Sequence, residues 1–296
     1  MRTIIGTTIL GILLNLMACQ SNLRVEEKAL NVQAYQEHSP TAHHQVALEV
    51  LEASKVWINA FNKGNIAGCV EGYANDAILN AIPLGRKKGK EEITNFWQSL
   101  IHSGAANLIY TNVKIEVAND STSFLSADWS MDIGYGKIYQ EKWEKKAGKW
   151  KLTLDDFEVL EQFKEPKENT TDPIAAHVLL ETFIHRSINW IKGFNQQNSA
   201  SCGAGYTQNA IMNAVPFANL SDKEAIQGFW KGLINNGAKN LIYHNPTFEL
   251  LTPNTAQLSS NWSMNIGEGK IYQEKWLFQN KEWVLAQDEF EVLKQY

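Results

Sequence analysis

Two sets of tyrosine and carboxylate residues, one in each half of the sequence, have the chemistry to exchange protons. A carboxyl group buried beside another carboxyl keeps its proton at neutral pH, so it can act as a general acid or base, and a tyrosine hydroxyl can assist it. The alternative is that these groups have a structural role only, in which they satisfy one another's hydrogen bonds in a core. The candidate catalytic residues of the first set are Tyr139, Glu141 and Asp155, and their equivalents in the second set are Tyr272, Glu274 and Asp288.

The first set falls on two expected strands, 137–145 and 149–160, which a tight turn at Gly148 should join. A three-residue loop with Gly148 in the left-handed position would make Lys145 face Lys149. Because side chains alternate between the two faces of a strand, this register decides which side chains share a face with the acidic residues.

Continued along the strands, that register makes Tyr139 face Asp155 and Glu141 face Thr153. Glu141 and Asp155 would then be diagonal neighbours, about 7–8 Å apart at the backbone. We therefore expect Tyr139, Glu141 and Asp155 to share a face that lines an enclosed pocket. The opposite face is expected to carry Trp150, Leu152 and Leu154.

Most of the chain is a duplication. Trp57 recurs as Trp190, and the same offset, which we call the repeat offset, relates residues 136–143 to residues 269–276. Self-similarity at a fixed offset indicates two copies of one fold. The expected organisation is a leader at 1–18, a tether at 19–41, a first domain at 42–161, a linker at 162–175 and a second domain at 176–296.

Within each copy, helices are expected to precede most of the strands. Apolar residues at helical spacing predict the helices, and alternating segments between turn residues predict the strands. The order ααβαββββ belongs to the α+β class. In the first copy we expect helices at about 46–61, 66–73 and 89–102, and strands at about 76–82, 107–118, 122–133, 137–145 and 149–160.

Residues 73–77 (Tyr-Ala-Asn-Asp-Ala), followed by residues 89–93 (Gly-Lys-Glu-Glu-Ile) and Phe96, resemble the nuclear transport factor 2-like superfamily. The resemblance is greatest to its SnoaL-like and ketosteroid-isomerase-like branch. It implies two tandem cone-shaped, cystatin-like domains, each a curved, mostly antiparallel sheet that wraps about three helices around a pocket. Many members dimerise through the outer face of the sheet, so the resemblance also implies an intrachain pseudo-dimer of the two copies.

The catalytic base of the ketosteroid isomerases is missing from both copies. In that family the base lies eight residues after the tyrosine of the Tyr-Ala-x-Asp-Ala string, and the same count from Tyr73 and Tyr206 reaches Ala81 and Ala214. The polar neighbours of these alanines are asparagines, and an amide cannot accept the proton at neutral pH. Steroid isomerisation by that mechanism is therefore not expected.

We expect the pockets to bind a small apolar or amphipathic molecule, without a cofactor or metal, because the histidines lack metal-ligand spacing. An acid–base enzyme of the isomerase, polyketide-cyclase, dehydratase or hydrolase type is the alternative, and a scaffold role is a third. The expected ligand-binding residues are Tyr73, Asn80, Trp97, Trp129, Tyr139, Glu141 and Asp155, with Tyr206, Asn213, Trp230, Trp262, Tyr272, Glu274 and Asp288 in the second copy.

The N-terminus resembles a bacterial lipoprotein signal peptide. An apolar run from Ile4 to Leu14 follows Arg2, and residues 16–19 (Leu-Met-Ala-Cys) are similar to a lipobox, which implies lipidation at Cys19. Residues 20–21 contain no acidic residue, which implies a lipid-anchored protein of the cell envelope, in the outer membrane and facing the periplasm. Acyl chains would attach the protein to that membrane without a spanning helix.

The composition excludes several other classes. The net charge of −5 and a pI near 5.8 disfavour nucleic acid as a partner. Three cysteines in 296 residues are too few for a disulfide-built scaffold. Cys69 and Cys202 occupy equivalent positions in the two copies, and we expect both to be small core residues rather than nucleophiles.

Overall fold

The computed structural model describes residues 39–167 and 170–296. The predicted leader, the lipobox and Cys19 lie outside these residues. Residues 40–296 form one compact unit that contains both copies of the duplicated sequence. We call residues 42–162 the first repeat and residues 175–296 the second repeat.

In the first repeat, two helices open the fold and most of the strands follow. Its elements are α2 (Ala42–Asn62), α3 (Ile66–Glu71), β1 (Tyr73–Ile82), β2 (Gly85–Lys88), α4 (Gly89–His102), β3 (Ile109–Asn119), β4 (Thr122–Met131), β5 (Gly134–Lys146) and β6 (Lys149–Gln162). The predicted order is confirmed except that it lacked β2, a four-residue strand that pairs with β1.

The second repeat has the same order of elements. They are α5 (Ala175–Asn195), α6 (Ser199–Ala204), β7 (Tyr206–Val215), β8 (Ala218–Ser221), α7 (Lys223–Asn235), β9 (Ile242–Thr252), β10 (Thr255–Met264), β11 (Gly267–Gln279) and β12 (Glu282–Gln295). The expected α+β class with two repeated units is therefore confirmed.

Local sequence explains where the first helices end. In α2 the buried side chains, among them Val50, Ser54 and Trp57, recur at helical spacing and face the sheet. Gly64, with φ of +64°, follows α2 in the left-handed conformation that glycine tolerates best. The Asn65 side chain then accepts a 3.0 Å hydrogen bond from the backbone N–H of Gly68 and so caps α3.

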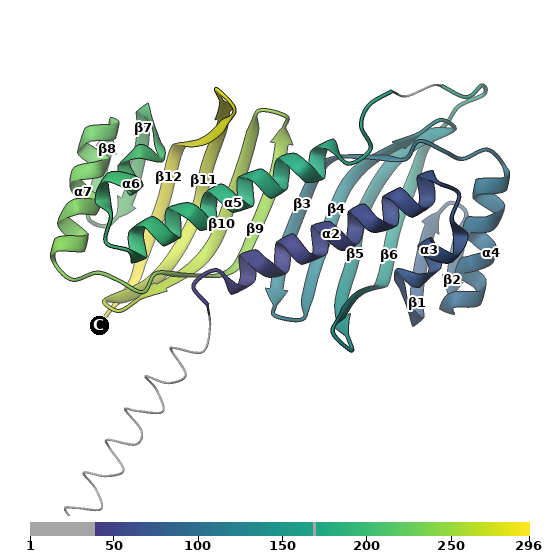
Figure 1. Cartoon of the computed structure of the whole chain (residues 1–296), viewed down its shortest axis with the longest axis horizontal. Helices are drawn as coiled ribbons and strands as arrows, with labels where there is room; N and C mark the ends of the chain where they lie inside the picture. The colour runs from purple at the N-terminus through teal and green to yellow at the C-terminus, as the bar shows by residue number, and fades with distance from the viewer. Residues whose placement is uncertain (1–38, 168–169) are drawn as a thin grey trace, which may run out of the picture. The chain divides into compact units, whose positions relative to one another are not determined.

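All twelve strands belong to one sheet, in the order β2-β1-β6-β5-β4-β3-β9-β10-β11-β12-β7-β8. β1 pairs with β6 in parallel, as β7 does with β12, and the other pairings are antiparallel. Figure 1 shows α2 and α5 lying across the same face of this sheet. The two long helices also contact each other.

The repeats meet edge to edge, where β3 pairs antiparallel with β9. Ile115 faces Phe248 at the centre of the junction, Lys114 faces Glu249, and Glu116 faces Thr247. The repeat offset exchanges the last two pairs with each other, so the junction is close to a two-fold axis. The resemblance implied pairing through the outer sheet faces, and that arrangement is wrong for this chain. Exposed strand edges are the usual place for a sheet to continue into a second copy.

Two reciprocal contacts join the helices across the same axis. His44 Nε2 lies 3.0 Å from Ser187 Oγ, and His177 Nε2 lies 3.0 Å from Ser54 Oγ. All four side chains are buried. Burial favours the neutral imidazole and lowers the pKa of each histidine to about 3.

Within residues 39–167 and 170–296, no helix is long and apolar enough to cross a membrane. Cys69 and Cys202 are both free thiols and both buried. Burial raises the pKa of Cys69 to about 11 and that of Cys202 to about 12, which makes these thiols poor nucleophiles at neutral pH.

Candidate functional site

The hairpin between β5 and β6 sets the geometry of the candidate site, and its turn is one residue shorter than predicted. Ala147 and Gly148 form a two-residue turn with φ of +49° and +79°, so Lys146 faces Lys149. Positive φ at both central residues is the signature of a type I′ turn, whose twist suits a hairpin. The predicted pairing of Lys145 with Lys149 is therefore wrong.

Two bulges then move the register further. Thr153 is an extra residue on β6, because Trp143 faces Leu152 while Lys142 faces Leu154. After this shift Glu141 lies directly opposite Asp155, rather than diagonal to it as the sequence predicted. A bulge of this kind places two residues against one and reverses the alternation beyond it.

The first bulge also lets residues on both sides of it point toward the helices. Leu152 is buried, and Trp150 Nε1 donates a 2.8 Å hydrogen bond to Glu49 on α2. Asp155 is buried as well. The prediction that Trp150 and Leu152 lie on the face opposite to Asp155 is wrong because it assumed strict alternation.

The second bulge turns Tyr139 away from the site. Ile138 faces Phe157 and Gln140 faces Asp156, which leaves Tyr139 as the extra residue on β5. Its side chain is 50% exposed and its hydroxyl donates to Glu158. Tyr272 is placed in the same way in the second repeat, where its hydroxyl donates to Glu291 at 2.5 Å. The predicted inward position of Tyr139 and Tyr272 is therefore wrong.

Tyr73 takes the place next to Asp155 that was expected for Tyr139. Its hydroxyl donates to Asp155 Oδ2 at 2.5 Å and accepts a 3.1 Å hydrogen bond from Trp97 Nε1. The second repeat has the same chain, with Trp230 donating to Tyr206 at 3.1 Å and Tyr206 donating to Asp288 at 2.6 Å. These bonds fix the orientation of each aspartate.

Glu141 has a separate pair of donors. Tyr110 donates to Oε1 and Trp143 Nε1 donates to Oε2, both at 2.9 Å. In the second repeat Tyr243 and Trp276 donate to Glu274 at 2.7 and 2.9 Å. A tyrosine hydroxyl can turn to accept, so the bond to Glu141 can persist when that carboxyl is protonated.

The carboxyl pairs are held partly protonated. Glu141 and Asp155 are only 2% and 4% exposed. Burial, followed by the charge of Asp155, raises the pKa of Glu141 to about 8, and burial raises that of Asp155 to about 6. The same causes raise the pKa of Glu274 to about 8, and burial raises that of Asp288 to about 7. At neutral pH each pair therefore keeps one proton, which the two carboxyl groups share.

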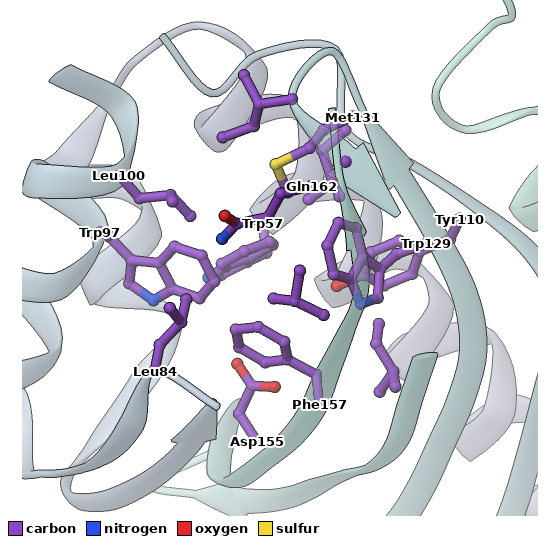
Figure 2. Close-up of a pocket in the computed structure, with 15 residues that line it drawn as sticks. Trp57, Leu84, Trp97, Leu100, Tyr110, Trp129, Met131, Asp155, Phe157 and Gln162 are labelled. Carbon is purple, nitrogen blue, oxygen red and sulfur yellow. The ribbon is translucent and has the colours of Figure 1, made fainter. Parts of the chain in front are cut away.

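Asp155 is the member of its pair that reaches a cavity. This cavity, of about 50 Å³, lies in the first repeat between α2, α4 and the sheet, and Figure 2 shows Phe157 beside Asp155 in its wall. Aromatic and aliphatic side chains form most of the lining. The lining residues are Trp57, Leu84, Trp97, Leu100, Leu108, Tyr110, Trp129, Met131, Ile133, Gly134, Ile138, Asp155, Phe157, Val159 and Gln162.

The second repeat contains the equivalent cavity at about 600 Å³. This volume falls within the range of about 300–1,000 Å³ that is usual for small-molecule sites. Asp288 lies in its wall among aromatic side chains. The lining residues are Trp190, Phe217, Gly228, Phe229, Trp230, Gly232, Leu233, Asn236, Leu241, Tyr243, Trp262, Met264, Ile266, Gly267, Ile271, Asp288, Phe290, Val292, Gln295 and Tyr296.

Two expected contacts lie outside the cavity walls. Asn80 donates a 3.0 Å hydrogen bond to Asp156, and neither Asn80 nor Asn213 is among the lining residues. Strand alternation explains this placement: on β1 the buried side chains Leu79 and Ala81 face inward, so Asn80 between them faces outward. Apart from Tyr139 and Tyr272, which point away from the site, the other expected residues either line the cavities or, like Tyr73 and Glu141, lie directly behind the lining carboxylate.

Several tryptophans in the cavity walls have an unused hydrogen-bond donor. The indole N–H groups of Trp57 and Trp129, and of Trp190 and Trp262, are buried without a partner. Each of these nitrogen atoms is itself buried, so the N–H groups do not open into the cavities, although other atoms of the same rings line them.

The sequence-based predictions missed Tyr110 and Trp57, along with their second-repeat equivalents. Both residues belong to segments that recur at the repeat offset, and this recurrence was the available signal. In residues 39–167 and 170–296 no group of three or more His, Cys, Asp or Glu side chains could hold a metal ion.

No protein-family model matches this chain, and no curated protein matches it. Several solved structures are similar to it. A protein with a cystatin-like fold from Nostoc punctiforme is 21% identical, and the match covers 38% of this chain and 90% of that one with a TM-score of 0.35. An NTF-2-like protein from Shewanella oneidensis is 18% identical, covering 37% of this chain and 96% of that one with a TM-score of 0.34.

A ketosteroid isomerase-like protein from Erwinia carotovora is 15% identical, covering 37% of this chain and 92% of that one with a TM-score of 0.34. Each of these matches spans about the length of one repeat. They concern the fold, and nothing about activity follows from them.

Proposed function

We propose that this protein binds a small, largely apolar molecule in the cavity of one or both repeats. The observation that carries the proposal is a cavity in each repeat with a mainly aromatic and aliphatic lining and one buried carboxylate, Asp155 or Asp288, and with about 600 Å³ of space in the second repeat. An apolar ligand would fill such a space and displace weakly held water.

Asp155 and Asp288 supply the polar contact that orients the ligand. Each aspartate is held by a tyrosine that is itself held by a tryptophan, so its direction is set before a ligand arrives. A preorganised polar group in an apolar wall gives specificity at little entropic cost.

Native mass spectrometry tests this proposal. The full chain carrying Cys19→Ser, which cannot be acylated, would be purified from a bacterial lysate and sprayed under non-denaturing conditions. The expected result is a stoichiometric adduct of low mass that is lost on denaturation. An adduct-free chain that also fails to take up any member of a library of apolar carbonyl compounds would contradict the proposal.

Acid–base catalysis is the second candidate function, and the buried carboxyl pairs favour it. Asp155 and Asp288 line the cavities, and their pKa values of about 6 and about 7 are near the pH at which a general acid or base works best. In such a reaction the aspartate would take up or release the proton, while the neighbouring glutamate would hold the second one.

Turnover of epoxide and polyketide compounds by the full chain tests this candidate. We expect any activity to disappear in the double variant Asp155→Asn/Asp288→Asn and to survive in Asp76→Asn, since the second repeat already has Asn209 at that position. Activity that persists in the double variant would exclude these carboxylates as the catalytic groups.

We also propose that the chain is a lipoprotein, anchored through Cys19 to the outer membrane and facing the periplasm. The lipobox-like residues 16–19 at the end of an apolar run support this location. Labelling of cells with radioactive palmitate, followed by membrane fractionation, is the test. Label in the wild-type chain and none in Cys19→Ser is expected, and equal labelling of both chains would contradict it.

A further inference from the structure

We infer that the second repeat holds the ligand, and that this ligand is an apolar molecule that extends from Asp288 along the face of α7 that carries Gly228 and Gly232. The inference rests on the proposed binding function and deepens it, because it assigns the site to one repeat and says which residues the occupant contacts.

The walls of the two cavities are nearly the same. Every lining position of the first cavity recurs in the second at the repeat offset, and only Leu84, which Phe217 replaces, differs in type. The volumes nevertheless differ, at about 50 Å³ and about 600 Å³. The first is enough for a few water molecules at most, whereas the second can enclose an organic ligand.

The extra space of the second cavity lies along α7. Five residues line it with no counterpart in the lining of the first cavity, namely Gly228, Phe229, Gly232, Asn236 and Tyr296. Gly228 and Gly232 are one turn apart on the same face of the helix. Both glycines are exposed, and a Cβ atom placed at either would meet nothing within 4 Å, so the cavity is open to solvent along this face.

The first repeat has side chains at these positions, since Asn95 and Ser99 correspond to Gly228 and Gly232. Glycine inside a helix is destabilising relative to almost any other residue except proline. Neither glycine has a positive φ that would require it. Asn95 and Ser99 are exposed and do not line the first cavity, whereas Gly228 and Gly232 line the second one.

The inner end of the site offers one donor. Asp288 lines the cavity at 5% exposure, and its carboxyl, whose pKa burial raises to about 7, can donate when it is protonated. The outer end is lined by aromatic rings, among them Phe217 and Phe229. The occupant therefore has an acceptor such as a carbonyl oxygen at its inner end and an apolar tail at its outer end.

Prodan and laurdan provide a matched pair of probes, because both have the same fluorescent naphthyl ketone and laurdan has a longer acyl chain. Fluorescence titration of the full chain carrying Cys19→Ser is expected to show one laurdan per chain, bound at least tenfold more tightly than prodan. Both probes are uncharged, so the carboxylates near the cavity do not repel them.

The double variant Gly228→Asn/Gly232→Ser introduces the residues of the first repeat into α7. Both substitutions favour the helix, so the fold should persist. We expect laurdan affinity to fall at least tenfold while prodan affinity changes less than twofold. The reciprocal variant Asn95→Gly/Ser99→Gly in α4 is the control, and it should leave laurdan as tightly bound as before.

Other results distinguish failure of this inference from failure of the proposed binding function. Equal affinity for both probes, two laurdan molecules per chain, or no loss of laurdan affinity in Gly228→Asn/Gly232→Ser would overturn this inference and leave the proposed binding function standing. If neither probe binds, both the inference and the binding of apolar carbonyl compounds are contradicted.

Discussion

His44 Nε2 in the first repeat lies 3.0 Å from Ser187 Oγ in the second, and the duplication repeats this contact between His177 and Ser54. The first helix of each repeat thus reaches under the sheet of the other. The ring of His44 packs at 5.9 Å from Tyr243, and that of His177 at 5.8 Å from Tyr110.

These tyrosines donate to the buried glutamates, Tyr110 to Glu141 and Tyr243 to Glu274. A side chain from the other repeat therefore packs against the tyrosine that holds each buried glutamate. These contacts and the pairing of β3 with β9 join the two repeats into one compact unit.

The first prediction concerns the two buried histidines. Their folded-state pKa of about 3 is below the unfolded value of about 6.5. Between these two pH values the histidines bind protons in the unfolded chain and remain neutral in the folded chain. Stability should therefore fall as the pH drops from about 6.5 toward 3, by up to about 1.4 kcal/mol per pH unit for each histidine. Urea unfolding at pH 7 and pH 5 should show that His44→Gln/His177→Gln loses less stability than the wild type over this interval. Exposed His102→Gln is the control, and an equal loss in the double variant would refute the prediction.

The second prediction concerns Glu141 and Glu274. Their folded-state pKa of about 8 is above the ordinary value of 4.5, so the stability they contribute is complete below pH 4.5 and is lost as the pH rises through about 8. The loss should reach about 1.4 kcal/mol per pH unit for each glutamate within that window. In thermal unfolding, Glu141→Gln/Glu274→Gln should flatten the decline in Tm between pH 5 and pH 8. Glu158→Gln, on the outer face, should decline as the wild type does, and a double variant that declines as steeply would count against buried protonated glutamates.

The third prediction compares two tyrosines of the first repeat. Tyr73→Phe removes the donor to Asp155 and the acceptor of Trp97, and both partners remain buried. We expect it to lower the free energy of unfolding by about 1–3 kcal/mol. Tyr139→Phe removes a hydroxyl from the exposed outer face, so it should change that free energy by less than about 0.5 kcal/mol. Urea titrations of the two variants measure the difference, and a larger loss in Tyr139→Phe would contradict the geometry of the site.

The fourth prediction concerns the turns of the two equivalent hairpins. The first has Gly148 at φ of +79°, and the second has Lys281 at φ of +68°. The left-handed conformation costs about 1–2 kcal/mol for a residue with a Cβ atom. Glycine avoids this cost but loses more chain entropy on folding, so the two effects partly cancel. Gly148→Lys should therefore destabilise the protein by about 1 kcal/mol, and Lys281→Gly should stabilise it by up to a similar amount. Differential scanning calorimetry of the two exchanges is the measurement, and shifts in Tm of the same sign would be inconsistent with type I′ turns.

Most of the secondary structure was predictable because it depends on local patterns. The helical spacing of Val50, Ser54 and Trp57 indicated α2, and the turn residues between strands marked β3 to β6 closely. The four-residue strands β2 and β8 were missed, because so short a segment shows no periodicity of its own and forms only against β1 or β7.

The burial of the acidic residues in the site was predictable, but their partners were not. Glu141 and Asp155 were expected to lie inside, and they are buried, but their tyrosine partners are Tyr110 and Tyr73 rather than Tyr139. A strand alternates strictly only until a bulge inserts a residue, and the bulge at Tyr139 is stabilised by the pairing of whole strands. No local sequence pattern in β5 indicates this bulge.

Duplication and periodicity can be recognised without coordinates, so the two copies of one α+β unit were evident in the sequence. The coordinates were needed to find that the copies join through β3 and β9, that His44 and His177 contact serines of the opposite repeat, and that the second cavity is the larger one. Pairing, register and cavity volume depend on contacts between residues far apart in the chain, and no local pattern records such contacts. The sequence shows that Gly228 stands where the first repeat has Asn95, but only the fold shows that Gly228 lines a cavity.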